Sequence, residues 1–295
     1  MADPTFQVAI TDDVDTFAAR AADWLAADPI PSNVVSTVLA AARRGDPIPS
    51  GSLWITVHAG PDVIAAAMRT PPFNLYLPPV PRGAAQAMAA ALHDAGHTLP
   101  GITGGTASTA EFVRTWAART GVAAALSRED GLHVLGTLVP PAGVGGRPRP
   151  AGPADADLCT EWETAFQQEA VPDRPLLRQQ LAASVARRVE RGTLLLWDDG
   201  ARPVSLAGWH APAAGVSRIG PVYTPPEQRR RGYAAAVTAA ATEAALAAGA
   251  EHVMLFTDLA NPTSNGVYAR IGYRRVGDAS EWTFTLPPNR DPAPS

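Results

Sequence analysis

The residue types that most clearly suggest chemistry form a short turn in the second half of the sequence. The turn consists of Arg229, Arg230, Arg231, Gly232, Tyr233 and Ala234. It follows a strand-like run at residues 217–224 and precedes an alanine-rich run that is typical of a helix. Free amides at a helix start converge on an anion, and the helix dipole favours phosphate by roughly 0.3 to 1 kcal/mol. The order strand, Pro-Pro, Arg, Gly, Ala and helix therefore favours a phosphate site over a solvated basic face, the alternative for an arginine run.

The spacing of Arg229, Gly232 and Ala234 matches a known signature. It fills the pattern Arg or Gln, two variable residues, Gly, one variable residue, then Gly or Ala. This pattern is similar to that of the GNAT superfamily of N-acetyltransferases, and the chain resembles the superfamily from residue 149 to 286 through its element order and a second motif at 258–273. The resemblance implies that acetyl-coenzyme A (acetyl-CoA) is the cosubstrate and that an amine is acetylated directly, without a covalent enzyme intermediate.

The resemblance also implies which further residues hold the cofactor. Val222 and Thr224 would lend main-chain groups to the pantetheine arm and the thioester carbonyl, where two strands splay apart. A carbonyl held in this way is polarised for attack. Ordinary strand packing is the alternative for both residues. Asn261 and Asn265 would contact the cofactor, and Tyr268 would lie near its sulfur.

Acetylation of an amine needs a proton donor for the departing thiolate and a group that takes the proton the amine loses. The Tyr268 hydroxyl, with an ordinary pKa of about 10, suits the first role, and core packing is its alternative. Deprotonating a typical alkylammonium at neutral pH costs roughly 4 kcal/mol. The candidates for accepting that proton are Glu169, His210 and Glu281. A surface or structural role is the alternative for each, and a chain of water molecules could replace all three.

Two aromatic residues, Trp162 and Phe166, lie one turn apart on a predicted helix at residues 155–170. Their shared face could line the acceptor pocket or belong to the core. We expect the acceptor to be the primary amine of a small molecule. Two alternatives stay open: a non-catalytic acyl-CoA sensor or interaction module, and an acetyltransferase of protein or peptide amines. A cofactor motif does not identify the acceptor, because acceptor pockets differ among proteins that share it.

The organisation of the chain predicts two domains. Its 295 residues exceed the usual size of one domain, and the interior segment richest in Pro and Gly is at residues 140–150. We expect a first domain at 1–140, a linker at 141–149 and a second domain at 150–295. Each is expected to have an α+β fold, with a mixed, mostly antiparallel sheet flanked by helices.

The elements of the second domain recur in the first. In the second, strands at 193–197 and 203–210 form a hairpin, and two strands at 273–276 and 281–286 come last. The first domain repeats the order, which indicates an internal duplication.

The first domain lacks most of the chemistry of the second. Its turn at residues 80–85 is shorter and has one arginine, and its segment 106–120 lacks equivalents of Asn265 and Tyr268. This departure from the motif argues against cofactor binding in the first domain, and we expect a degenerate copy of the fold that shapes the acceptor cleft.

Composition excludes several partners. The net charge of -4 gives no general attraction to nucleic acid. The single cysteine, Cys159, cannot form an internal disulfide or a multi-cysteine metal site, and no metal is expected. The N-terminal residues lack the features of a signal peptide, and the most apolar run, at 234–250, is too weakly hydrophobic to span a bilayer. We expect a cytoplasmic monomer or homodimer without a membrane partner.

Overall fold

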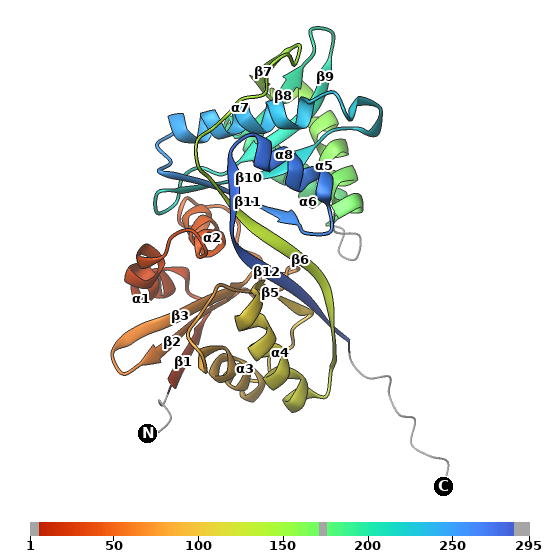
Figure 1. Cartoon of the computed structure of the whole chain (residues 1–295). Helices are drawn as coiled ribbons and strands as arrows, with labels where there is room; N and C mark the ends of the chain where they lie inside the picture. The colour runs from red at the N-terminus through yellow and green to blue at the C-terminus, as the bar shows by residue number, and fades with distance from the viewer. Residues whose placement is uncertain (1–5, 171–175, 286–295) are drawn as a thin grey trace. The chain divides into compact units, whose positions relative to one another are not determined.

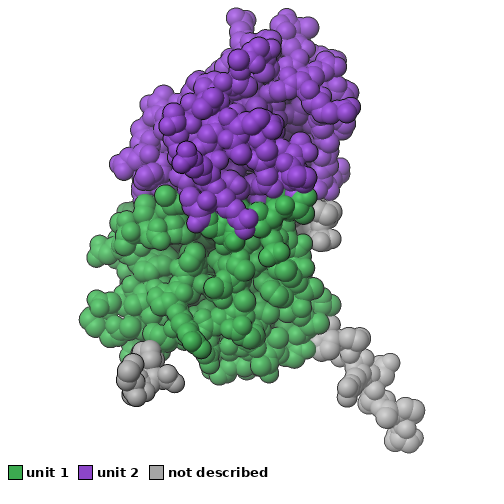
Figure 2. Space-filling model, viewed as in Figure 1, with its two compact units in different colours: residues 1–131, 258–260, 277–295 green, residues 132–257, 261–276 purple. Residues whose placement is uncertain are grey.

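The computed structural model of the chain describes residues 6–170 and 176–285. These residues form two compact units, coloured separately in Figure 2. Of the described residues, the first unit contains 6–131, 258–260 and 277–285, and the second contains the remainder. The strands β6 (Ala123–Leu135) and β12 (Tyr273–Thr285) each contribute residues to both units.

The first unit is a sheet with a pair of helices on each face. Side chains alternate across a strand, and in β2 this alternation separates two cores: Leu53 and Ile55 pack with α3 and α4, whereas Trp54 packs with α1 and α2. The elements are β1 (Phe6–Thr11), α1 (Val14–Ala27), α2 (Asn33–Arg43), β2 (Leu53–Ala59), β3 (Asp62–Arg69), β4 (Leu75–Leu77), α3 (Ala84–Asp94), β5 (Gly101–Gly105) and α4 (Thr106–Thr120), followed by parts of β6 and β12.

The second unit has the same construction (Figure 1). Leu195 of β8 packs on the face covered by α7, whereas its neighbours Leu194 and Leu196 pack on the face covered by α5 and α6. The elements are β7 (Arg147–Pro150), α5 (Ala156–Ala170), α6 (Arg178–Glu190), β8 (Leu194–Asp198), β9 (Pro203–Trp209), β10 (Val216–Tyr223), α7 (Tyr233–Ala247), β11 (His252–Asp258) and α8 (Pro262–Arg270).

The strand pairing repeats between the units. In the first, β1, β2, β3 and β4 are joined by antiparallel pairing, and β4 pairs with β5 in parallel. In the second, β7, β8, β9 and β10 are joined by antiparallel pairing, and β10 pairs with β11 in parallel. The predicted fold class, a mixed and mostly antiparallel sheet flanked by helices, is confirmed.

Helix α7 lies against β8, β9 and β10. Alanine has the highest helix propensity, and its small side chain allows close approach to a sheet. Of the two buried threonines of α7, Thr242 is accommodated by hydrogen bonds: its Oγ1 donates to the carbonyl of Thr238 over 2.8 Å and lies 2.7 Å from the hydroxyl of Tyr273. No helix among the described residues has the length and apolar character that crossing a membrane requires.

The structure differs from the sequence prediction at both ends of the second domain. Residues 273–276 and 281–285 form one continuous strand, β12, rather than two, because Ala279 to Thr283 pair with β5 of the first unit; residue 286 lies outside the described part. The expected linker at 141–149 contains the start of β7, which pairs with β8. The compact units therefore divide the chain at Gly131 and Leu132 and again within β12, not at the Pro- and Gly-rich segment.

Candidate functional site

The strands β10 and β11 pair over only part of their length. They are parallel neighbours where residues 216–218 lie opposite residues 252–254. Beyond this point β10 continues to Tyr223 and β11 to Asp258, and the described residues show no further pairing between the two. An unpaired strand edge offers N–H and C=O groups to an extended ligand that itself contains amides. Val222 lies on this part of β10.

The turn from β10 into α7 has a backbone suited to an anion. Arg230 and Gly232 both have positive φ values, of 63° and 84°, and Gly232 is the N-cap of α7. Left-handed residues within a turn direct successive N–H groups toward a common point, which is the geometry of anion-binding nests. Gly232 makes no side-chain cap, Arg231 is exposed, and Tyr233 and Ala234 form the first, half-buried positions of the helix.

Arg229 is already engaged at the base of this turn. Its Nε donates to the main-chain carbonyl of Thr224 over 2.9 Å, and its Nη2 donates to both carboxylate oxygens of Glu169, at 2.8 and 2.7 Å. Its guanidinium also lies 5.8 Å from the ring centre of Tyr223. The structure thus brings together two residues that the sequence predicted for separate roles, Arg229 for the cofactor and Glu169 as a proton acceptor.

Thr224 itself is held from the other side. Its hydroxyl lies 2.8 Å from the Ser205 hydroxyl, which also donates to the carbonyl of Tyr223 over 3.0 Å. These buried contacts fix the end of β10 just before the turn.

The second predicted motif forms helix α8. Asn261 is its N-cap and accepts from the Ser264 N–H over 3.0 Å, while Asn265 Nδ2 donates to the Asn261 carbonyl over 2.9 Å. Tyr268 packs edge-on against Tyr273, with ring centres 6.3 Å apart. Burial raises the pKa of Tyr268 to about 12. The hydroxyl therefore keeps its proton throughout the neutral and mildly alkaline range, although it is a weaker acid than an ordinary tyrosine.

The predicted acceptor-side aromatic residues lie in the core beneath β10. Trp162 is 8% exposed, and its ring centre lies 6.3 Å from that of Tyr223. Phe166 packs against the hydrophobic cluster that contains both residues. Cys159, one turn before Trp162, is fully buried, and burial raises the pKa of its thiol to about 12. A buried thiol held protonated in this way is a packing residue.

The two remaining candidates for the proton acceptor lie in different units. His210 follows β9 in the second unit, where its Nε2 lies 3.3 Å from Nη2 of Arg218. Glu281 belongs to the first unit, where it is 9% exposed, accepts from Asn74 Nδ2 over 3.2 Å and lies 3.9 Å from Arg128 Nη2. Within its own unit, each of these two side chains is in contact with a charged or polar neighbour.

The first unit contains a turn that also ends in a left-handed glycine at the start of a helix, and a carboxylate occupies it. Gly83 is the N-cap of α3 with φ 87°, close to the value at Gly232. Here, however, the Gly83 N–H donates to Glu111 Oε1 over 2.8 Å, and the Val80 N–H donates to Ser108 Oγ over 2.9 Å. Both acceptors come from α4. The amides that could converge on an anion are therefore partly occupied by side chains of the same unit.

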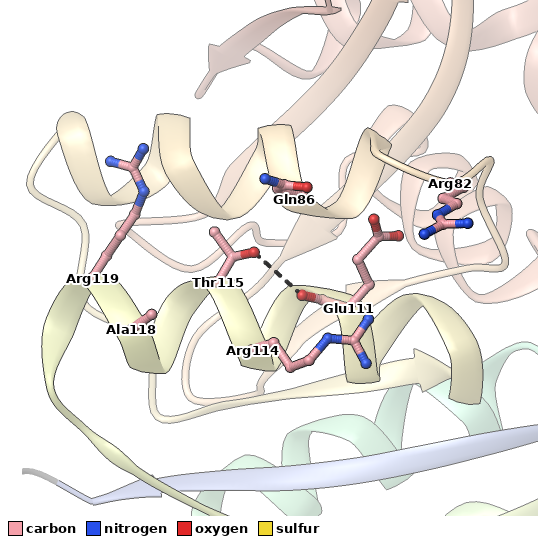
Figure 3. A pocket seen from close by; sticks show the side chains of 7 residues that line it. All are labelled: Arg82, Gln86, Glu111, Arg114, Thr115, Ala118 and Arg119. Carbon is pink, nitrogen blue, oxygen red and sulfur yellow. Dashed lines mark hydrogen bonds between the residues drawn. The ribbon is translucent and has the colours of Figure 1, made fainter. Parts of the chain in front are cut away.

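Figure 3 shows the surroundings of this carboxylate. A cleft of about 420 Å³ lies along α3 and α4, and Glu111 reaches across it toward the turn that begins α3. Arg82 and Arg114 also line the cleft. Sequence inspection did not find Glu111, because its partner lies 28 residues earlier and only the packing of two helices brings them together.

Glu111→Ala is expected to destabilise the protein. The substitution leaves the Gly83 N–H without its acceptor, which should lower the free energy of unfolding by about 1 to 2 kcal/mol. Denaturant unfolding measures this effect, and Glu111→Gln, which keeps an acceptor oxygen, is the control and should lose less. Equal stability of Glu111→Ala and the wild type would contradict the capping role.

Comparison with known proteins agrees with this arrangement. Residues 198–283 match the family model described as FR47-like protein, a span that includes the turn at Gly232 and all of α8. A search with the whole sequence finds no match among curated proteins. Among solved structures, a GNAT-family acetyltransferase from Colwellia psychrerythraea is similar at 12% identity and a TM-score of 0.58, with 95% of this chain and 100% of that chain covered.

Two further structures have the same fold over nearly the whole chain. A GCN5-related N-acetyltransferase from Sphaerobacter thermophilus is 15% identical, with a TM-score of 0.58 and 95% of each chain covered. A tandem GNAT protein from the clavulanic acid biosynthesis pathway is 14% identical, with a TM-score of 0.56 and coverage of 95% of this chain and 98% of that chain. At these identities the likeness is one of fold. The chain has the fold of the GNAT acetyltransferases in its tandem form, and the predicted resemblance is confirmed.

Proposed function

We propose that the second unit binds acetyl-CoA and transfers its acetyl group to a primary amine of a small molecule. The observation that carries the proposal is that the open edge of β10 leads along the chain into the left-handed turn at Gly232. An extended arm with amides fits the first, and a pyrophosphate fits the second. When bound, acetyl-CoA would supply an activated thioester.

The residues of the second unit have separate tasks in this proposal. The turn formed by Arg229, Arg230, Arg231, Gly232, Tyr233 and Ala234 holds the pyrophosphate, and Asn261 and Asn265 at the start of α8 contact the cofactor. The main chain at Val222 and Thr224 aligns the pantetheine arm and polarises the thioester carbonyl.

The chemical step needs one proton donor and one proton acceptor. The amine nitrogen attacks the thioester carbonyl, a C–N bond forms, the C–S bond breaks, and Tyr268 gives its proton to the departing sulfur. Because burial raises the Tyr268 pKa to about 12, Tyr268 gives up its proton less readily than an ordinary tyrosine. The amine's own proton passes to His210 of the same unit or to water, whereas Glu281 belongs to the first unit.

Glu169 is better suited to holding Arg229 than to accepting a proton, because both of its carboxylate oxygens accept from Arg229 Nη2. Its side chain is 49% exposed, and exposed ion pairs contribute only about 0 to 1 kcal/mol. Glu169→Gln should therefore keep its turnover and bind acetyl-CoA about 2- to 5-fold more tightly at low ionic strength, since Arg229 becomes available to the pyrophosphate. Initial rates and calorimetry measure the two quantities. A loss of turnover with unchanged affinity would restore Glu169 as the proton acceptor.

The first unit is proposed to be a degenerate copy that takes no cofactor. Glu111 and Ser108 occupy the amides of its turn, and a carboxylate at that place repels a phosphate. Under this proposal residues 150–295 carry the acyl-donor site, and residues 1–140 do not.

The test of the proposed function is a screen for thiol release. The protein is incubated with acetyl-CoA and a panel of amino acids, polyamines, aminoglycosides and peptides, and free thiol is measured with a chromogenic disulfide. Amine-dependent release with a small molecule supports the proposal, and release with peptides alone would favour a protein acetyltransferase. Tight binding of acetyl-CoA without release across the panel would favour a sensor.

A further inference from the structure

Two buried charges lie on the face of the second unit's sheet that α5 and α6 cover. Glu163 on α5 and Arg188 on α6 have side chains 6% and 14% exposed, and Arg188 Nη1 donates to Glu163 Oε1 over 2.8 Å. Burial raises the pKa of Glu163 and lowers that of Arg188, and the attraction between the two charges opposes both effects. Apolar residues often replace such a pair without loss of stability, because desolvation offsets the attraction. Stability alone therefore does not account for this pair.

The strand β10 contains a bulge on the same face. Two of its residues, Gly220 and Pro221, lie opposite the single residue Gly208 of β9. Gly220 has a φ of 149°, which residues with a side chain rarely adopt. Bulges bend their strand and increase its twist, and the pairing of β10 with β11 ends at Arg218, just before this bulge.

Arg188 connects the ion pair to the bulge. Its Nη2 donates to the carbonyl oxygen of Gly220 over 2.8 Å. A side chain at Gly208 would overlap this same nitrogen, so glycine at that position makes room for the guanidinium. The bulge carbonyl is therefore held by a charged donor, and Glu163 fixes the position of that donor.

We propose that Arg188 is a positioning residue for the acyl-donor site. By holding the Gly220 carbonyl, it fixes the bulge from which Val222 and Thr224 present their main-chain groups to the pantetheine arm. The proposal rests on the proposed function, because it assigns Arg188 to the same site. Arg188 itself touches no reacting atom. It acts on the main chain at Val222 through the two bulge residues, Gly220 and Pro221.

The experiment replaces the ion pair with apolar residues in the full-length protein. The double variant Glu163→Leu with Arg188→Met keeps the volume and removes both charges, so it should unfold at a denaturant concentration close to that of the wild type. Its affinity for acetyl-CoA should fall about 10-fold or more, because displacing a binding group by about 1 Å is costly. Its affinity for adenosine bisphosphate, the nucleotide half of coenzyme A without pantetheine, should change less than about 3-fold, since the turn at Gly232 is untouched.

Two further variants complete the test. Arg149→Met removes a half-buried arginine of the same unit that pairs with Asp155 and Asp198, and it should leave both affinities unchanged. Arg188→Lys keeps the charge beside Glu163 but lacks the second guanidinium nitrogen that reaches Gly220. Its affinities for the two ligands should therefore change as in the double variant. If the double variant does not fold, the affinities of Arg188→Lys test the positioning role.

Two results would overturn the positioning role: unchanged affinity for acetyl-CoA, or an equal loss for both ligands, which would indicate general damage. Failure of the wild type to bind acetyl-CoA would instead contradict the proposed function itself.

Discussion

Replacing Gly232 with valine is expected to weaken binding of acetyl-CoA about 100-fold. Gly232 has φ 84°, and a Cβ there would lie 2.8 Å from Val144 Cγ2. A left-handed conformation costs a residue with a side chain roughly 1 to 2 kcal/mol, so the turn should change its backbone and its N–H groups should no longer converge. Losing two charge-assisted hydrogen bonds of about 1.5 kcal/mol each corresponds to a fall in affinity of about 100-fold. Isothermal titration calorimetry measures this fall in affinity.

The chain provides a matched control in its first unit. Gly83 has φ 87°, begins α3 as Gly232 begins α7, and would bring a Cβ to 2.7 Å from Phe6 Cε2. Gly83→Val should therefore cost a similar amount of stability in denaturant unfolding, while the affinity for acetyl-CoA stays at the wild-type value. If Gly83→Val weakened binding as much as Gly232→Val, the effect of the latter would be one of stability and not of the turn.

Tyr268→Phe is expected to lower kcat by about 100-fold or more, the usual range for losing a general acid. The phenylalanine ring keeps the edge-on contact with Tyr273, so stability and the affinity for acetyl-CoA should change little. Single-turnover rates at saturating acetyl-CoA measure the chemical step without product release. An unchanged single-turnover rate would leave Tyr268 with a packing role alone.

The raised pKa of Tyr268 also predicts the shape of the pH profile. The wild-type rate should increase with pH as the acceptor amine loses its proton, and loss of the Tyr268 proton should begin to reduce it only as the pH approaches 12. The sign for stability follows from the same shift. The folded state holds this proton more tightly than the unfolded chain does, so the stabilisation is complete below the ordinary tyrosine pKa of about 10. It is lost as the pH rises through about 12.

The elements with a local sequence signal were predicted well. The Asp-Gly turn at residues 199–200 specifies the hairpin of β8 and β9, and the alanine-rich run after Gly232 specifies α7. The last strand was predicted less well. Residues 277–280 look like a turn in the sequence, but they lie within β12, which pairs with β5. That pairing depends on a partner about 180 residues away in sequence, and no local pattern encodes such a partner.

The same distinction holds for the candidate site. The turn and α8 have short motifs, so their residues could be named in advance. The ion pair of Arg229 with Glu169 joins residues 60 apart, and the contact of Arg188 with Gly220 spans 32. Neither has a spacing that a sequence pattern would reveal. The structure also divides the arginine run. Arg229 is held by hydrogen bonds within the protein, whereas Arg230 and Arg231 are exposed at the surface of the turn.

The central claim is that, of two turns that each end in a left-handed glycine at the start of a helix, one binds the acyl donor. Titrating acetyl-CoA into the full-length wild-type protein by calorimetry tests it most directly. The account predicts saturable binding at one site per chain, about 100-fold weaker in Gly232→Val and unchanged in Gly83→Val. Absence of binding to the wild type, or two equivalent sites per chain, would contradict it.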